Sequence, residues 1–130
     1  MVLDTSAILA VLLNESDADA YRRAIEADPV RLLSAATLIE TAIVIETRVG
    51  EAGGRELDLL VHKASIEVVA VDAEQADLAR DAYRRFGKGR HPDGLNYGDC
   101  FAYALSQSVG EPLLFKGDDF RKTDVMVVSL

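Results

Sequence analysis

The stretch MVLDTSAILAVLL, residues 1–13, passes from a strand pattern to a helix pattern without a linker. Residues 1–3 are continuously apolar, which is typical of a short buried strand. From Thr5 onward the apolar residues recur at helical spacing, so we expect the chain to leave the strand and enter a helix at Asp4. A strand followed at once by a helix is typical of a parallel α/β arrangement.

The same alternation continues to the end of the chain. Further apolar segments typical of strands are VRLLSA, IEVVAV, EPLLF and VMVVSL, at residues 30–35, 66–71, 111–115 and 125–130. Helical patterns lie between them, over residues 17–28, 36–49, 54–64, 72–86 and 94–106. Because strands joined through helices are usually parallel, we predict one α/β domain over residues 1–130. It should be a three-layer α/β/α sandwich with a central, mostly parallel sheet.

The composition is that of an ordinary globular protein, with 49% apolar and 28% charged residues. The single cysteine, Cys100, excludes an internal disulfide framework and favours a reducing cytoplasm. The apolar run at residues 7–13 is too short to span a bilayer, and Asp4 interrupts any signal-peptide pattern, so we expect no membrane association. A net charge of −8 argues against general electrostatic binding of nucleic acid, which would need a local basic patch or bound cations.

In parallel α/β sheets, ligand sites lie at the carboxyl ends of the strands. Asp4 and the GDD aspartates follow predicted strands, and Glu40 and Asp99 lie on predicted helices that could border the same edge. We therefore expect several acidic residues to meet there. Each also has an ordinary explanation: a helix cap for Asp4, a solvated helix edge for Glu40 and a capping box with Asn96 for Asp99. The GDD sequence after the strand EPLLF is by itself only a turn signal. The candidates for one acidic site are Asp4, Glu40, Asp99, Asp118 and Asp119.

Carboxylates gathered in a cleft would repel one another and raise their pKa values, unless a divalent cation joined them. Carboxylate oxygens suit Mg²⁺ or Mn²⁺, whereas two His and one Cys make a zinc site improbable. A cation held beside a phosphodiester activates water and stabilises charge on the phosphate. The acids therefore favour metal-dependent hydrolysis of phosphodiester bonds, and the cation would let an acidic protein admit a polyanion.

With these residues in view, the sequence resembles the PIN-domain ribonucleases, in particular the VapC toxins of VapBC toxin–antitoxin systems. The matching segments cover nearly the whole chain: MVLDTSAILAVLL, SAATLIETAIVI, GRHPDGLNYGDCFAYALS and PLLFKGDDFRKTDV, at residues 1–13, 34–45, 89–106 and 112–125. The third segment is the most specific. The resemblance implies a PIN-like sandwich and a Mg²⁺- or Mn²⁺-dependent endoribonuclease. It also implies a homodimer restrained by a cognate VapB-type antitoxin.

Residue by residue, Asp4, Glu40 and Asp99 match the three main acids of that family. The resemblance implies that Asp4 and Asp99 hold the principal metal ion, and that Glu40 binds a second ion or orients the attacking water. Either Asp118 or Asp119 would be the fourth acid of the site. Cleavage would leave a 5′-phosphate and a 3′-hydroxyl.

One hydroxyl beside the first acid, on Thr5 or Ser6, matches a position that could support a metal ligand or a water. A catalytically silent PIN-fold interaction module is the alternative. A receiver-like phosphoacceptor domain would need a second acid near Asp4, and an Asp-x-Asp phosphatase has Ser6 where its second acid should be.

The densest basic stretch is RRFGKGRH, residues 84–91, which leads into the helix that carries Asp99. Cations at a helix end complement the helix dipole, so this stretch can be simply a solvated helix terminus. Alternatively, it binds the phosphates of RNA at the rim of the acidic site. The residues that would do so are Arg84, Arg85, Lys88, Arg90 and His91.

Overall fold

The structure of the chain is a computed structural model that describes residues 1–92 and 94–130. Within these residues, four short strands form one sheet in the order β3-β2-β1-β4. Every neighbouring pair is parallel, and Val2 lies opposite both Leu32 and Leu113. The sheet is thus parallel throughout, which confirms the predicted α/β fold. The strands are β1 (Val2–Leu3), β2 (Leu32–Ser34), β3 (Glu67–Val69) and β4 (Leu113–Leu114).

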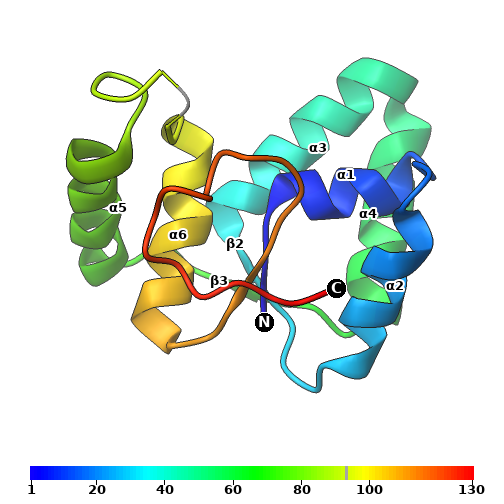
Figure 1. The fold of residues 1–130 in the computed structure, drawn as a ribbon. Helices are drawn as coiled ribbons and strands as arrows, with labels where there is room; N and C mark the ends of the chain where they lie inside the picture. The colour runs from blue at the N-terminus through cyan, green and yellow to red at the C-terminus, as the bar shows by residue number, and fades with distance from the viewer. Residues whose placement is uncertain (93) are drawn as a thin grey trace.

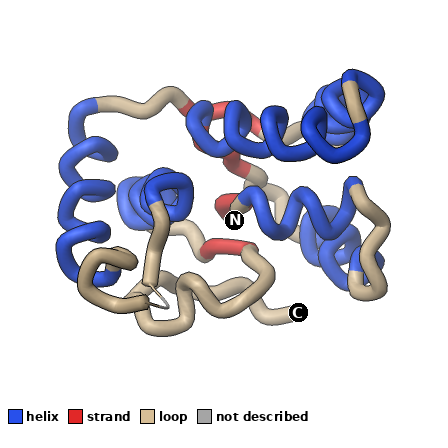
Figure 2. The backbone as a smooth tube through the Cα atoms, turned by 90° about the horizontal axis from the view of Figure 1, so that it is seen from above, coloured by secondary structure: helices blue, strands red, loops and turns tan. Residues whose placement is uncertain are grey.

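Six helices in the described part of the chain cover the two faces of this sheet and complete the three expected layers (Figure 1). Helices α5 and α6 lie on one side and α1 to α4 on the other, and the view from above separates the same two groups (Figure 2). The helices are α1 (Thr5–Leu12), α2 (Ala18–Ala27), α3 (Ala35–Val49), α4 (Glu51–Lys63), α5 (Ala73–Phe86) and α6 (Tyr97–Val109).

The alternation of side chains along each strand produces two hydrophobic cores. Leu3 and Leu33 pack with α1 to α4, whereas their preceding neighbours Val2 and Leu32 pack with α5 and α6. β4 repeats the pattern through Leu114 on the first side and Leu113 on the second. Strands that are buried on both faces are apolar at every position, which explains why they appear in the sequence as short continuous apolar runs.

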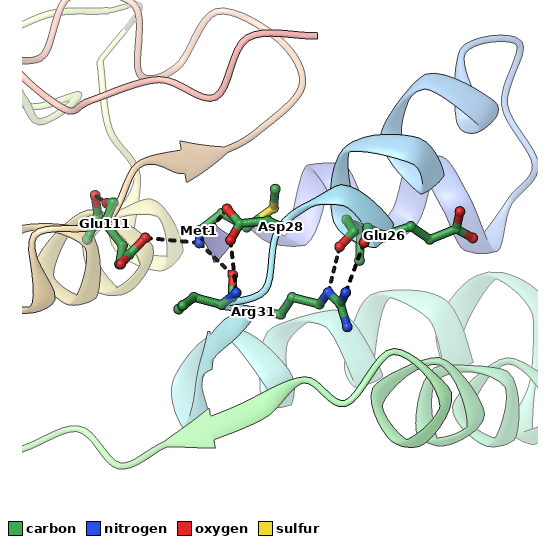
Figure 3. A network of polar contacts seen from close by, with 8 residues as sticks. Met1, Glu26, Asp28, Arg31 and Glu111 are labelled. Atoms are coloured by element: carbon green, nitrogen blue, oxygen red, sulfur yellow. Dashed lines mark hydrogen bonds and ion pairs between the residues drawn. The ribbon is translucent and has the colours of Figure 1, made fainter.

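The amino ends of the strands are fixed by polar contacts at the edge opposite Asp4 (Figure 3). The terminal amine of Met1 donates to Asp28 at 3.0 Å, to Glu111 at 3.2 Å and to the carbonyl of Val30 at 2.6 Å. The guanidinium of Arg31 donates to three backbone carbonyls, those of Ile25, Glu26 and Ala64. These contacts tie the N-terminus to the segments before β2 and β4 at the amino edge of the sheet, opposite the carboxyl edge where Asp4 lies.

The predicted strand over residues 125–130 is wrong, because only Val127 forms a bridge, with Leu113. Two backbone hydrogen bonds flank the bridge: Leu113 N donates to Met126 O at 2.8 Å, and Val128 N donates to Leu113 O at 3.1 Å. The segment lies at the edge of the sheet beside a strand of only two residues, so it has no longer partner with which to pair. The apolar pattern of residues 125–130 does not show how short the neighbouring strand is.

The strand order reverses at β1, and this reversal positions the site. From β1 the chain moves outward to β2 and β3, then crosses back through α5 and α6 to place β4 on the other side of β1. The carboxyl ends of the neighbouring strands β1 and β4 therefore flank a switch point, where α/β sheets bind ligands. None of the described helices is long and apolar enough to cross a membrane.

Candidate active site

Asp4 directly follows β1 at this switch point, and it is buried. Its Oδ2 accepts two hydrogen bonds from Ser6, from the backbone N at 3.0 Å and from Oγ at 2.6 Å. Ser6 Oγ in turn accepts from the backbone N of Lys116 at 2.9 Å, which links Asp4 to the segment after β4. Burial raises the pKa of the Asp4 carboxyl, the hydrogen bonds from Ser6 oppose that rise, and the charge of Glu40 adds to it. Asp4 is thus both the expected helix cap and part of an acidic site.

Glu40 lies on α3 and is half-buried against the start of α1. Thr5 Oγ1 donates to Glu40 Oε1 at 2.6 Å and also lies 3.0 Å from Thr41 Oγ1. The hydrogen bond from Thr5 holds the Glu40 carboxylate against the start of α1, so it does not extend into solvent as a helix-edge residue would. Both hydroxyls next to Asp4 therefore have a structural role, because Ser6 holds Asp4 and Thr5 holds Glu40.

Gly98 brings Glu40 close to the beginning of α6. A Cβ atom at position 98 would overlap the carboxylate of Glu40, so a residue with a side chain could not occupy this position without displacing it. Because Gly98 has no side chain, the Glu40 carboxylate can lie against α6 at the residue just before Asp99. The glycine in NYGD is thus needed for a close approach between two elements of the site.

Asp99 is 7% exposed and forms the predicted capping box with Asn96. Asp99 N donates to Asn96 Oδ1 at 2.8 Å, and Asn96 N donates to Asp99 Oδ2 at 3.0 Å. Burial raises the pKa of the Asp99 carboxyl to about 8, with further increases from the negative charges of Asp4 and Asp119 and from a hydrogen bond with Asp119. At neutral pH and without a cation, the Asp99 carboxyl is therefore largely protonated.

The two aspartates of the GDD sequence differ in exposure and in partners. Asp119 is half-buried and forms the hydrogen bond with Asp99. Asp118 is exposed and accepts from Arg121 Nε at 2.7 Å. Gly117 has a φ of +99°, in the left-handed region that favours glycine, and lies in the turn just before the two aspartates. Of the two, only Asp119 interacts with the other acids.

The described residues contain no group of three or more His, Cys, Asp or Glu side chains already arranged to hold a metal ion. The acids lie instead as mutually repelling neighbours, with Asp4, Glu40 and Asp99 each held by a hydrogen bond. Their donor atoms are hard carboxylate oxygens, which fit Mg²⁺ or Mn²⁺. A divalent cation would remove the repulsion that raises the pKa of Asp99, so the donor set and its electrostatics fit such an ion.

A cleft of about 620 Å³ adjoins Asp119 and has cations on its walls. Its lining residues are Lys88, Pro92, Asp118, Asp119, Arg121 and Lys122. Of the predicted basic residues, Lys88 thus reaches the rim of the acidic site. Arg121 and Lys122 were not among the predicted basic residues. The sequence does show them, as two adjacent cations shortly after GDD.

The other four predicted basic residues occupy different surroundings. Arg85 donates to Asp81 at 3.3 Å and to Asp124 at 3.2 Å, so its guanidinium joins α5 to the C-terminal segment. Arg84 pairs with Asp81 at 3.7 Å on the exposed surface of α5. Arg90 is exposed, and His91 and Arg85 both line a smaller cavity of about 160 Å³ that also touches Asp119. Arg85 therefore has a structural role that competes with any contact to RNA.

We expect the metal-free protein to lose stability as the pH rises from 6 to 8. The pKa of Asp99 is about 8 in the folded chain, against 3.8 for an ordinary aspartate, so within this window the folded state holds a proton that the unfolded state has lost. A rise in pH then favours unfolding, by at most about 2 kcal/mol between pH 6 and pH 8. Asp4, whose pKa is also raised, acts in the same direction.

Thermal unfolding in EDTA at the two pH values measures this loss. Asp99→Asn should flatten the dependence, because the amide does not titrate. Equal slopes for the wild type and the variant would show that Asp99 is not the group responsible.

Residues 1–126 match the family model described as PIN domain. The chain is 63% identical over 128 residues to the ribonuclease VapC of Mycolicibacterium smegmatis, covering 98% of this chain and 99% of that protein. It is 59% identical over 130 residues to the ribonuclease VapC30 of Mycobacterium tuberculosis, covering 100% and 99%. The chain belongs to the PIN-domain family and, within it, to the VapC ribonucleases.

Solved structures give the same fold at low sequence identity. The structure of M. tuberculosis VapC20, described as a sarcin–ricin-loop-cleaving toxin, superposes with a TM-score of 0.78 at 20% identity and covers 99% of this chain and 98% of that one. A chain of VapBC2 from Rickettsia felis, bound to a DNA fragment from its promoter, also has a TM-score of 0.78, at 12% identity, covering 98% and 96%. These likenesses establish the PIN-like sandwich that the sequence predicted.

Proposed function

We propose that this chain is a metal-dependent endoribonuclease toxin of a type II toxin–antitoxin system. It hydrolyses RNA phosphodiester bonds at the acidic site and is neutralised by a cognate VapB-type antitoxin. The observation that carries the proposal is Asp99, a buried acid at the switch point whose pKa is raised beside Asp4 and Asp119. The capping box of α6 uses one oxygen of this carboxyl, and a cation-dependent site would account for its burial next to two further acids. Full-length identity to VapC ribonucleases supports the same conclusion.

Asp4 and Asp99 are the proposed ligands of the principal Mg²⁺ or Mn²⁺, and Asp119, not Asp118, is the proposed fourth acid. When bound, the cation would make hydroxide available from water at neutral pH and would stabilise charge on the phosphate. Asp99 must release its proton for this binding, so activity should rise with pH through the neutral range.

The remaining residues act by position and charge. Glu40, held by Thr5, would orient the attacking water or serve a second ion. Ser6 keeps the carboxylate of Asp4 directed into the site through its link to the Lys116 backbone. Cations of the adjoining cleft, with Lys88 and Arg121 among them, would attract the phosphates on either side of the scissile bond.

The test is cleavage of total RNA by the purified chain, free of any antitoxin, with Mg²⁺ or with EDTA. New ends that carry a 5′-phosphate should form only with the metal, and their mapping would identify the target sequence. A folded, metal-loaded chain that leaves all RNA intact would favour the alternative, a catalytically silent PIN-fold interaction module.

A protein partner is supported by the apolar surface between α3 and α4. A groove of about 550 Å³ runs there, lined in part by Leu38, Ile39, Ala42 and Ile43. Ile39 and Ile43 are 61% and 60% exposed, and adjacent exposed isoleucines usually mark an interaction surface. Solved relatives include a toxin–antitoxin complex from Klebsiella pneumoniae. We propose that an antitoxin or a second copy of the chain covers this groove.

The affinity for single-stranded RNA should depend on salt through the basic loop. If three or four cations contact phosphates, log affinity should fall with log salt at a slope of roughly −2 to −3. Replacing Lys88 and Arg90 together by Ala should flatten that slope by about one to two units and spare metal binding. The measurement is fluorescence anisotropy of a short RNA, in the Asp99→Asn background to prevent cleavage.

Lys63→Ala is the matched control, because this exposed lysine ends α4 in the other helical layer. It should leave the slope unchanged. An unchanged slope in the Lys88/Arg90 variant would instead return residues 84–91 to the simpler interpretation of a solvated helix terminus.

A further inference from the structure

Tyr97 is an exposed aromatic residue at the start of α6 that the proposed chemistry does not use. Its side chain is 79% exposed, more than any other large apolar or aromatic side chain in residues 1–92 and 94–130. It lies two residues before Asp99, and the intervening Gly98 abuts Glu40. Tyr97 thus lies in the same helical turn as Asp99, at the end of α6 that faces the carboxyl edge of the sheet, and its ring is open to solvent.

The ring of Tyr97 is held in place although it is exposed. Phe101, one turn further along α6 and half-buried, packs against it with centroids 4.9 Å apart and an interplanar angle of 86°. An edge-to-face contact of this kind fixes the orientation of the ring but covers only a small part of it. Tyr97 therefore presents an open aromatic surface whose position is already set, so little conformational entropy is lost when a ligand stacks on it.

The charge of the protein makes such a surface useful to an RNA-binding site. The chain carries a net charge of −8, so phosphate contacts alone give limited attraction. Bases of single-stranded RNA are unstacked and have π faces, and stacking on an aromatic side chain does not depend on the local field. The cationic cleft adjoins Asp119, whereas Tyr97 belongs to the helix that carries Asp99. The cleft therefore adjoins one acid of the site, and Tyr97 lies in the first turn of the helix that carries another.

We propose that Tyr97 is a stacking platform for a nucleobase that flanks the scissile phosphate. The inference rests on the proposed function, because it assigns a base subsite to the same acidic centre. The ligand is an unpaired nucleotide of single-stranded RNA, and stacking predicts tolerance of base identity at that position.

The experiment measures the affinity of Tyr97→Ala and Tyr97→Phe for a short single-stranded RNA, both in the Asp99→Asn background. Tyr97→Ala should weaken binding by about 5- to 100-fold, with an unchanged salt slope because no cation is removed. Tyr97→Phe keeps the ring and should bind within about twofold of the parent. Circular dichroism verifies that the alanine variant is folded, as expected for a position so exposed.

An abasic scan of the RNA identifies the base. One abasic position should weaken binding to the parent as much as Tyr97→Ala does, and the two losses should not add. Equal affinity of the parent and Tyr97→Ala would overturn the inference. So would a lower oligomeric mass of Tyr97→Ala with unchanged affinity per protomer, because a second copy of the chain would then be what covers the ring.

Cleavage by the otherwise wild-type chain separates this inference from the proposed function. RNA that is cut with Mg²⁺ but bound equally well by Tyr97→Ala would refute the platform alone. RNA that is bound through Tyr97 but never cut would refute the nuclease and leave the platform standing. An RNA that is neither bound nor cut would overturn both.

Discussion

Replacement of Asp99 by asparagine should lower RNA cleavage by more than about 100-fold while the chain stays folded. Loss of an outer-shell partner of a metal already costs about 10- to 100-fold, and Asp99 is proposed as a direct ligand. An amide is nearly isosteric with a carboxylate but binds a hard cation poorly. It can still accept the hydrogen bond from Asn96 N that completes the capping box, so α6 should begin as before. Asp4→Asn should behave alike, because asparagine is also a good N-cap.

The GDD sequence provides the matched control for this prediction. Asp119→Asn should impair cleavage, since Asp119 forms the hydrogen bond with Asp99. Asp118→Asn should cleave at nearly the wild-type rate, because Asp118 is exposed and pairs with Arg121. Initial rates on the same RNA at saturating Mg²⁺ compare the variants. Folded Asp4 and Asp99 variants that cut at the wild-type rate would disprove the site assignment, and equal losses at 118 and 119 would disprove the choice of Asp119.

The features that could be predicted from sequence are those set by local pattern. Apolar runs and helical spacing are properties of adjacent residues, so the parallel α/β order and the caps at Asp4 and Asn96 follow from them. The strand-end rule then brought the acids of separate segments to one edge. Asp4 follows from this rule, whereas Glu40 and Asp99 lie on helices and were assigned to the site by their match to the family's acids.

The features that could not be predicted depend on contacts between distant residues. The orientation of Asp119 toward Asp99 joins two segments twenty residues apart and follows a turn at Gly117. Arg85 belongs to the predicted basic stretch, but its pairing with Asp124 crosses 39 residues of sequence. The separate roles of Thr5 and Ser6 likewise became visible only when α3 and the segment after β4 were in place.

Gly98→Ala should lower RNA cleavage by about 10- to 100-fold without weakening the fold. The added Cβ would overlap the Glu40 carboxylate, which is the mobile end of a flexible side chain and so would be displaced in preference to the backbone. Displacement would break the 2.6 Å hydrogen bond from Thr5 and move the group that orients the attacking water. A misplacement of about 1 Å in a positioned group can cost about 100-fold in rate. Alanine is a better helix former than glycine by about 1 kcal/mol, so thermal unfolding should not reveal a loss of stability.

A double-mutant cycle with Glu40→Gln determines whether the effect acts through Glu40. If it does, the double variant should cleave no more slowly than Glu40→Gln alone, since the displaced group is already disabled. Gly54→Ala is the control, because a Cβ there would also meet a glutamate carboxylate, that of Glu46, but in the groove between α3 and α4. Gly98→Ala that cuts RNA at the wild-type rate would mean that Glu40 can move without consequence, and its proposed role in orienting water would be wrong. Additive losses in the cycle would instead mean that the alanine disturbs Asp99, the neighbouring residue on the first turn of α6.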